Sequence, residues 1–96
     1  MKATLLHRDK FIYADGAIRE MVLWRLPESD AERTHGLKYS FYYGRGGKRL
    51  IGYDNERGKG DHRHYGEHEE IYVFESVEKL IQDFANDVDE VRSAMK

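Results

Sequence analysis

The chain of 96 residues contains no cysteine and only one proline. The absence of cysteine excludes a disulfide scaffold, a thiolate zinc site and a cysteine nucleophile, and it fits a reducing compartment. No apolar run approaches the ~20 residues that a membrane-spanning helix needs, and the first residues lack the apolar stretch of a signal peptide. We therefore expect one domain, residues 1–96, in a cytoplasmic protein without a membrane segment.

Charge of one sign is not in excess over the whole chain, since the formal net charge is −2. This argues against a protein that binds nucleic acid through an overall basic surface. The distribution is uneven, however. Residues 45–65 hold six Lys or Arg against three acids, whereas residues 66–96 hold nine acids against three bases. Such asymmetry fits either two solvated faces or a basic binding segment followed by an acidic one.

The first two-thirds of the chain has the pattern of antiparallel β-strands. Alternating apolar stretches are separated by two hairpin signals that contain glycine, Asp15-Gly16 and residues 44–47. Alternation groups Trp24 with Ile18 and Val22, and we expect Trp24 to fill the core between sheet and helix. The expected strands are residues 2–13, 17–26, 37–43, 48–54 and 71–75.

The last twenty residues have the pattern of an amphipathic helix. Ser76 can cap its first turn by accepting from backbone N–H groups, and the helix is expected to run to about Met95. We predict an α+β fold, a twisted antiparallel β-sheet of four to five strands with one C-terminal α-helix packed on a face. The apolar stripe of the helix consists of Val77, Leu80, Ile81, Phe84, Val88 and Val91.

Residues 55–70 break the strand pattern, and we expect a long loop there. The segment has three glycines, three histidines and eight charged residues, with no aliphatic side chain. A structureless loop of this length is unusual in a compact domain and is often functional. The chemistry of the protein is therefore expected in or beside this segment.

One interpretation of the segment is phosphate handling. Arginine grips phosphate bidentately, and two histidines that titrate near neutral pH can act as acid and base. Metal-independent ribonucleases need a base for the 2′-hydroxyl, an acid for the leaving oxygen and cations for the phosphorane charge. Which histidine is the base stays open, and no cofactor is expected. The predicted catalytic residues are His62, His64, Arg63, Lys59 and Arg57.

Aromatic rings and further cations flank this segment. Tyrosine rings can stack on the bases of single-stranded RNA, and the cations of the second hairpin can contact phosphates. The predicted substrate-binding residues are Tyr53, Tyr65, Arg49, Lys48 and Arg45. Tyr39 and Tyr42 are further stacking candidates.

Two other interpretations compete with phosphate handling. His62-x-His64 followed by Glu69 resembles the metal-ligand spacing of cupins, with His68 and Asp61 as further ligands, but no histidine follows His68 to supply a second motif. Alternatively, the segment is structural, and its acids pair with its cations to hold the loop. Surface pairs of that kind contribute only about 0–1 kcal/mol each.

Residues 52–64, with the sequence GYDNERGKGDHRH after a strand that ends VLWRLP at residues 22–27, resemble the TumE-type toxins of bacterial and archaeal toxin–antitoxin loci. The likeness runs from Lys2 to about Val91. It implies a small cytoplasmic toxin encoded beside a helix-turn-helix antitoxin that binds and neutralises it.

Three hypotheses of function follow. The first is a metal-independent endoribonuclease toxin that acts on RNA. The second is a module that binds RNA or protein without chemistry, and the third is a small metal-dependent enzyme. The expected partners are the cognate helix-turn-helix antitoxin and RNA, and no membrane. The tyrosine-rich strand formed by Tyr39, Phe41, Tyr42 and Tyr43 offers an apolar strip for a homodimer or an antitoxin contact.

Overall fold

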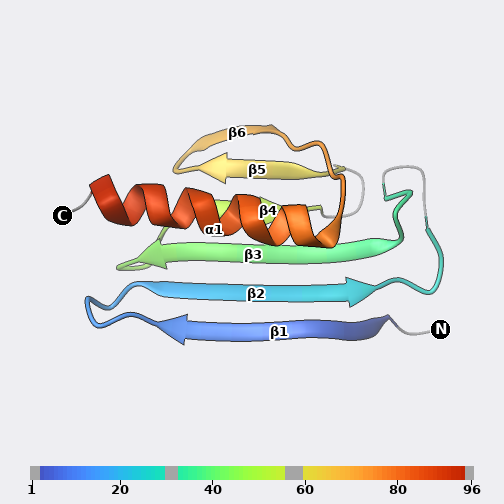
Figure 1. Cartoon of the computed structure of the whole chain (residues 1–96), viewed down its shortest axis with the longest axis horizontal. Coiled ribbons are helices and arrows are strands. Elements are labelled where there is room, and N and C mark those ends of the chain that lie inside the picture. The colour runs from blue at the N-terminus through green and yellow to red at the C-terminus, as the bar shows by residue number, and fades with distance from the viewer. Residues whose placement is uncertain (1–2, 30–32, 56–59, 95–96) are drawn as a thin grey trace.

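A computed structural model describes residues 3–29, 33–55 and 60–94. Six strands form one antiparallel meander in chain order, and a helix follows (Figure 1). No helix in these ranges has the length and apolar character to cross a membrane. The elements are β1 (Thr4–Ile12), β2 (Ile18–Arg25), β3 (Leu37–Arg45), β4 (Lys48–Asp54), β5 (His62–Tyr65), β6 (His68–Ile71) and α1 (Val77–Ala94).

The α+β class and the single C-terminal helix are confirmed, with one strand more than the four to five expected. The extra strand lies where the sequence predicted a long loop, because residues 62–71 form the hairpin β5–β6. The strand predicted at residues 71–75 is wrong, since β6 ends at Ile71 and residues 72–76 belong to no strand, although the N–H of Tyr72 still donates to the carbonyl of Asp61 at 3.0 Å.

The hairpin β5–β6 forms with only one aliphatic side chain, that of Ile71, because charged residues pair across it. Arg63 lies opposite Glu70 and donates to it from Nε at 2.9 Å, while His64 lies opposite Glu69. Opposite charges at directly facing positions stabilise antiparallel strands. Gly66, with φ +59°, supplies the left-handed conformation that the two-residue turn requires.

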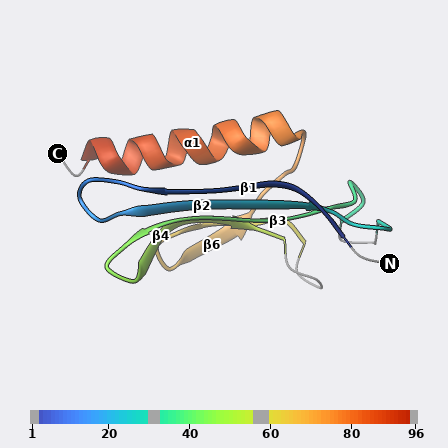
Figure 2. The ribbon, with the colours of Figure 1, turned by 90° about the horizontal axis from the view of Figure 1, so that it is seen from below.

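Helix α1 covers one face of the sheet and leaves the other face open (Figure 2). The backbone N–H of Lys79 donates to Ser76 Oγ at 3.0 Å, so the predicted cap is confirmed. Leu80, Phe84 and Val88 are buried against the sheet, as the apolar stripe predicted. The helix is described to Ala94, and the expected end at about Met95 lies outside the described residues.

Strand alternation decides which residues face α1. On β2 the buried residues are Met21 and Leu23, which join the core with Tyr39 and Phe41 of β3. Trp24 alternates with them, lies half-buried on the open face and is not part of the core, so its expected place beneath the helix is wrong. The prediction failed because both faces of β2 carry apolar side chains, so the alternation alone does not show which face packs against α1.

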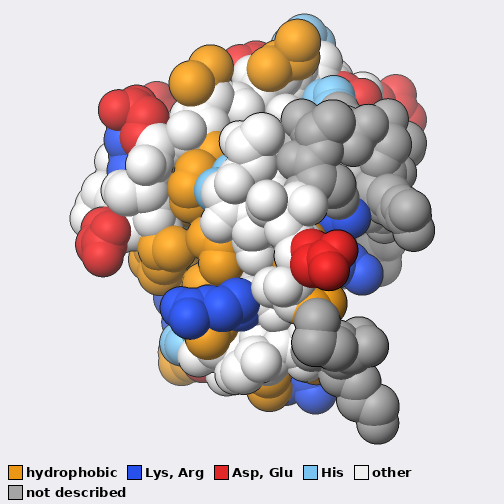
Figure 3. All heavy atoms as spheres, turned by 90° about the vertical axis from the view of Figure 1, so that its right-hand side faces the viewer, with side chains coloured by type: hydrophobic (Ala, Val, Ile, Leu, Met, Phe, Trp, Pro, Cys, Tyr) orange, Lys and Arg blue, Asp and Glu red, His pale blue; other side chains and the backbone are white. Residues whose placement is uncertain are grey.

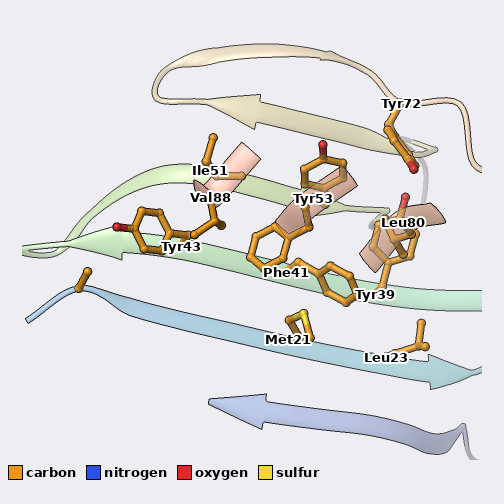
Figure 4. Packing of buried hydrophobic residues seen from close by; sticks show 12 residues of the cluster. Met21, Leu23, Tyr39, Phe41, Tyr43, Ile51, Tyr53, Tyr72, Leu80 and Val88 are labelled. Carbon is orange, nitrogen blue, oxygen red and sulfur yellow. The ribbon is translucent and has the colours of Figure 1, made fainter. Parts of the chain in front are cut away.

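The core is unusual in its tyrosines, whose rings pack beneath α1 while their hydroxyl groups reach charged residues (Figure 4). A buried hydroxyl without a partner is destabilising by about 1–3 kcal/mol, so each of these contacts is needed. Tyr39 donates to Asp61 at 2.9 Å, Tyr53 donates to Asp87, Tyr72 donates to Asp83 at 2.7 Å, and Tyr43 accepts from Arg92 at 2.9 Å.

These tyrosines make stability fall at high pH. Burial first, and then the neighbouring carboxylates, raise the pKa of Tyr39, Tyr53 and Tyr72 well above the usual value of 10.0. The unfolded chain releases these protons near pH 10 while the folded chain holds them. The contribution is therefore complete below pH 10 and is lost above it, by about 1.4 kcal/mol per pH unit for each tyrosine.

Chemical denaturation between pH 8 and pH 11.5 measures this loss. We expect the free energy of unfolding to be level up to about pH 9.5 and to fall by about 4 kcal/mol per unit above pH 10. Tyr53→Phe should make the slope about a third shallower. A free energy that stays constant to pH 11.5 would contradict the burial of these rings.

Candidate functional site

The alternation of β5 divides the predicted catalytic residues between the two faces of the sheet. Opposite β4, His62 faces Asp54 and His64 faces Gly52, whereas Arg63 pairs with Tyr53 of the core. The two histidines therefore lie on the open face, and Arg63 lies on the face that α1 covers. The structure brings the imidazoles together but does not bring Arg63 to them.

His64 is held between two carboxylates on the open face. Its side chain is only 8% exposed, with Nε2 at 3.4 Å from Asp54 Oδ2 and Nδ1 at 3.4 Å from Glu69 Oε2. Nε2 is buried and makes no hydrogen bond with any described residue. Each ring nitrogen therefore faces one carboxylate, and a nitrogen that carries a proton can donate toward it.

Gly52 creates the space that His64 and Arg49 share. A Cβ at position 52 would lie 2.9 Å from Arg49 Cδ and 3.4 Å from His64 Cδ2, so the two side chains flank the same bare stretch of strand. A bulge in β4 between its pairings with Tyr43 and Gly44 shifts the alternation. The shift lets Arg49 lie across the open face, where it brings a guanidinium beside the imidazole.

His62 has a fixed tautomer. Its Nδ1 lies 3.1 Å from the carbonyl oxygen of Gly60, which can only accept, so Nδ1 carries the proton. In the neutral ring the lone pair is then on Nε2, and no described residue makes a hydrogen bond to that atom. The two histidines therefore differ in their surroundings, because both nitrogens of His64 face carboxylates.

The hairpin ends beside this cluster form an open hollow of about 630 Å³. Two of the predicted substrate-binding cations, Lys48 and Arg49, line it, while Arg45 is exposed at the turn before them. Tyr42, which the sequence suggested as a stacking residue, also lines the hollow. The sequence did not indicate the remaining walls, which are Gly47, Gly66 and Glu67.

Arg63 belongs to a separate network beneath α1. It forms an ion pair with Glu70 at 2.9 Å, donates to the hydroxyl of Tyr53 at 3.5 Å and lies over the ring of Tyr65, 5.2 Å from its centre. Burial lowers its pKa, but these hydrogen bonds outweigh burial and raise it overall. Burial, then the charge of Asp87, raises the pKa of Tyr65.

The remaining predicted residues lie elsewhere. Tyr53 and Tyr39 are 0% and 1% exposed, so neither ring offers a face on which a base could stack. Arg57 and Lys59 lie outside the described residues. Tyr65 is half-buried beside Arg63 on the helix side.

Other residues in and beside the segment 52–64, which carries the family resemblance, have a structural role. Asn55 is fully buried, accepts from the N–H of Tyr39 and donates to the carbonyl of Leu37, which ties β4 to the start of β3. Asp61 accepts from Tyr39 and lies 3.2 Å from Nε2 of His35, whose ring packs on Phe74. Figure 3 views this end of the molecule, where hydrophobic side chains form a patch among polar ones. No sequence signal pointed to His35.

The residues of the metal interpretation do not gather into one site. His62, His64 and Glu69 do share the open face. Across residues 3–29, 33–55 and 60–94, however, no three His, Asp or Glu side chains gather as metal ligands would. The possible ligands nearest to His64 are two carboxylates, and each of them faces a different nitrogen of the ring.

The two faces of the molecule differ in charge. Helix α1 carries five acids and two bases. The open face carries Arg49 beside the histidines and Lys38 on β3 further along, and neither cation has an ion-pair partner in the described part of the chain. It also carries Asp54 and Glu69, the two acids beside His64. The acids of the helix repel a polyanion, so the open face is the less repulsive of the two.

The chain was compared with known proteins. A family model described as Toxin TumE matches residues 2–92. No curated protein and no solved structure matches the chain. The match spans every described strand and nearly the whole of α1.

Substitution of two glycines tests the geometry of the open face. Gly44→Ala should lower the free energy of unfolding by about 1–3 kcal/mol, because its Cβ would lie 2.5 Å from the carbonyl oxygen of Lys48. Gly52→Ala should change it by less than about 1 kcal/mol, because a flexible side chain, Arg49, can move aside.

Chemical denaturation measures both variants, and NMR of the His64 ring reports the displacement of Arg49. We expect the His64 resonances to shift in Gly52→Ala and not in Gly44→Ala. Unchanged His64 resonances in Gly52→Ala would show that position 52, between Arg49 and the ring, does not lie beside His64 as described.

Proposed function

We propose, from the fact that this chain belongs to the TumE toxin family, that it acts by binding RNA on the open face of the sheet and cleaving it without a metal. Membership makes the chain the toxin of a toxin–antitoxin system and implies an antitoxin partner. The activity on RNA, the place of action in the cytoplasm and a helix-turn-helix fold for the antitoxin are proposals.

One observation carries the proposal. Two imidazoles with different surroundings lie two residues apart on one strand face, and a guanidinium lies beside the second of them. Pairs of titratable groups in distinct environments are how a single site supplies both an acid and a base. The guanidinium fits the non-bridging oxygens of a phosphate.

The roles follow from the hydrogen bonds. His62 Nε2 takes the proton of a 2′-hydroxyl, and the 2′-oxygen attacks the adjacent phosphorus. The bond from phosphorus to the 5′-oxygen breaks, and that oxygen takes a proton from the His64 imidazolium. A 2′,3′-cyclic phosphate and a 5′-hydroxyl result. Arg49 stabilises the charge that develops on the phosphorane oxygens.

Purified variants test these roles against single-stranded RNA in the presence of a chelator. His62→Ala should lower the rate of cleavage by about 10²–10⁴-fold, and Arg49→Ala should lower it by about 10²-fold or more. Both should keep the fold. Expression of these variants should arrest cell growth less than expression of the wild type, and the variant that cleaves more slowly should arrest it less.

Arg25→Ala is the matched control, because Arg25 is an exposed arginine on the other face of the same sheet. It should cleave at the wild-type rate. Arg63→Ala should act differently again, by lowering the melting temperature through loss of the Glu70 and Tyr53 contacts. Wild-type cleavage by the His62 and Arg49 variants would remove this assignment.

A second candidate function is favoured by the burial of His64, which is 7% exposed. On this alternative the toxin binds RNA without cleaving it, and His64 only positions Arg49. Wild-type protein would then yield no cleavage products at any excess. Binding would weaken steeply with salt, because phosphate contacts release counterions, and Arg49→Ala would reduce the slope of that dependence.

A further inference from the structure

Strand β1 is an exposed sheet edge along its whole length. It pairs with β2 on one side only, and nothing among the described elements lies beyond it, as Figure 2 shows from that side. Eight of its nine residues are exposed. Natural sheets usually shorten, cover or bend such an edge because it offers unpaired backbone groups to other chains.

β1 carries exposed apolar side chains toward both ends, on either side of its polar residues 7–10, although a free edge is normally polar throughout. Of the six large hydrophobic residues that are exposed in the described chain, four lie on β1: Leu5, Leu6, Phe11 and Ile12, at 42–63% exposure. The other two, Ile71 and Val73, lie at or just beyond the four-residue strand β6, which offers a much shorter edge. A partner strand therefore gains most at β1.

The hydrogen bonds of the β1–β2 hairpin determine which N–H and C=O groups of β1 point away from the sheet. The N–H of Tyr13 donates to the carbonyl of Ala17, so these two residues form a hydrogen-bonded pair. Antiparallel pairs alternate, and the register is regular from His7 to Ile12. The N–H and C=O groups of Arg8, Lys10 and Ile12 therefore point outward, away from β2.

Charge selects the partner. Asp9 is already paired with Arg19 at 3.1 Å, whereas Arg8 and Lys10 have no ion-pair partner in the described residues. A second copy of this chain fits poorly. Two copies of β1 related by a twofold axis would pair as antiparallel strands and form one continuous sheet. The register that pairs the whole strand places Arg8 directly opposite Arg8 of the second copy, and this like-charge pair is destabilising.

We propose that the antitoxin neutralises this toxin by adding a strand to the outer edge of β1. The added segment is extended, alternates apolar with acidic residues, and places its acids opposite Arg8 and Lys10. This inference rests on the antitoxin that family membership implies and not on the cleavage of RNA. The predicted homodimer strip is not available for the contact, because Tyr39, Phe41 and Tyr43 are buried beneath α1.

Lys10→Pro and Lys10→Thr form a matched pair. Proline removes only an N–H that points outward, which an edge strand tolerates, and both variants remove the same charge. The probe is the purified protein encoded beside this chain, and calorimetry measures its binding. We expect Lys10→Pro to bind at least about tenfold more weakly than Lys10→Thr, with equal melting temperatures and equal RNA cleavage in the free state.

Hydrogen exchange on the wild-type complex gives a second measurement that needs no variant. The amides of Arg8, Lys10 and Ile12 should exchange about tenfold or more slowly in the complex than in the free toxin. Equal binding by the two Lys10 variants, unchanged exchange at these three amides, or no binding of the neighbouring protein to wild type would each overturn the proposal. Loss of RNA cleavage with intact binding would overturn the proposed function alone.

Discussion

The pairing of β5 with β4 is the constraint on which the rest of the account depends. Because neighbouring residues of a strand point to opposite faces, Tyr53 in the core fixes its partner Arg63 beneath α1. His62 and His64 are then placed on the open face without any further choice. A shift of one residue would exchange these positions and leave a guanidinium among the exposed groups and two imidazoles under the helix.

The residues of segment 52–64 lie on both faces of the sheet, and the two sets have different roles. Tyr53, Asn55, Asp61 and Arg63 hydrogen-bond to one another or to residues of β3, and Tyr53 also donates to Asp87 of α1. On the open face, Gly52 leaves room for groups that the fold does not need for packing. A string of residues that looks like one functional motif is therefore two interleaved sets, one structural and one available for chemistry.

The sequence predicted the α+β class, the first four strands, the capping by Ser76 and the apolar stripe of α1, because apolar periodicity and turn glycines are local signals. It did not predict the hairpin β5–β6, since the alternation there is carried by charged and aromatic residues and not by aliphatic ones. It also placed Trp24 on the wrong face, because β2 is apolar on both. The convergence of His62, Arg63 and His64 on one pocket was assumed from their nearness along the chain, and strand geometry separates adjacent residues. Arg49 was predicted as a cation of the hairpin, but its place beside His64 depends on a bulge in β4 that has no sequence signal.

The most direct measurement of the central claim is NMR mapping of the wild-type protein with a short single-stranded oligonucleotide whose 2′-hydroxyls are methylated, so that no cleavage can occur. The account predicts that the resonances of Arg49, Gly52, His62 and His64 shift on titration, while those of Arg63, Asp87 and the rest of α1 do not. Shifts concentrated on α1 and around Arg63, with the open face unchanged, would contradict it.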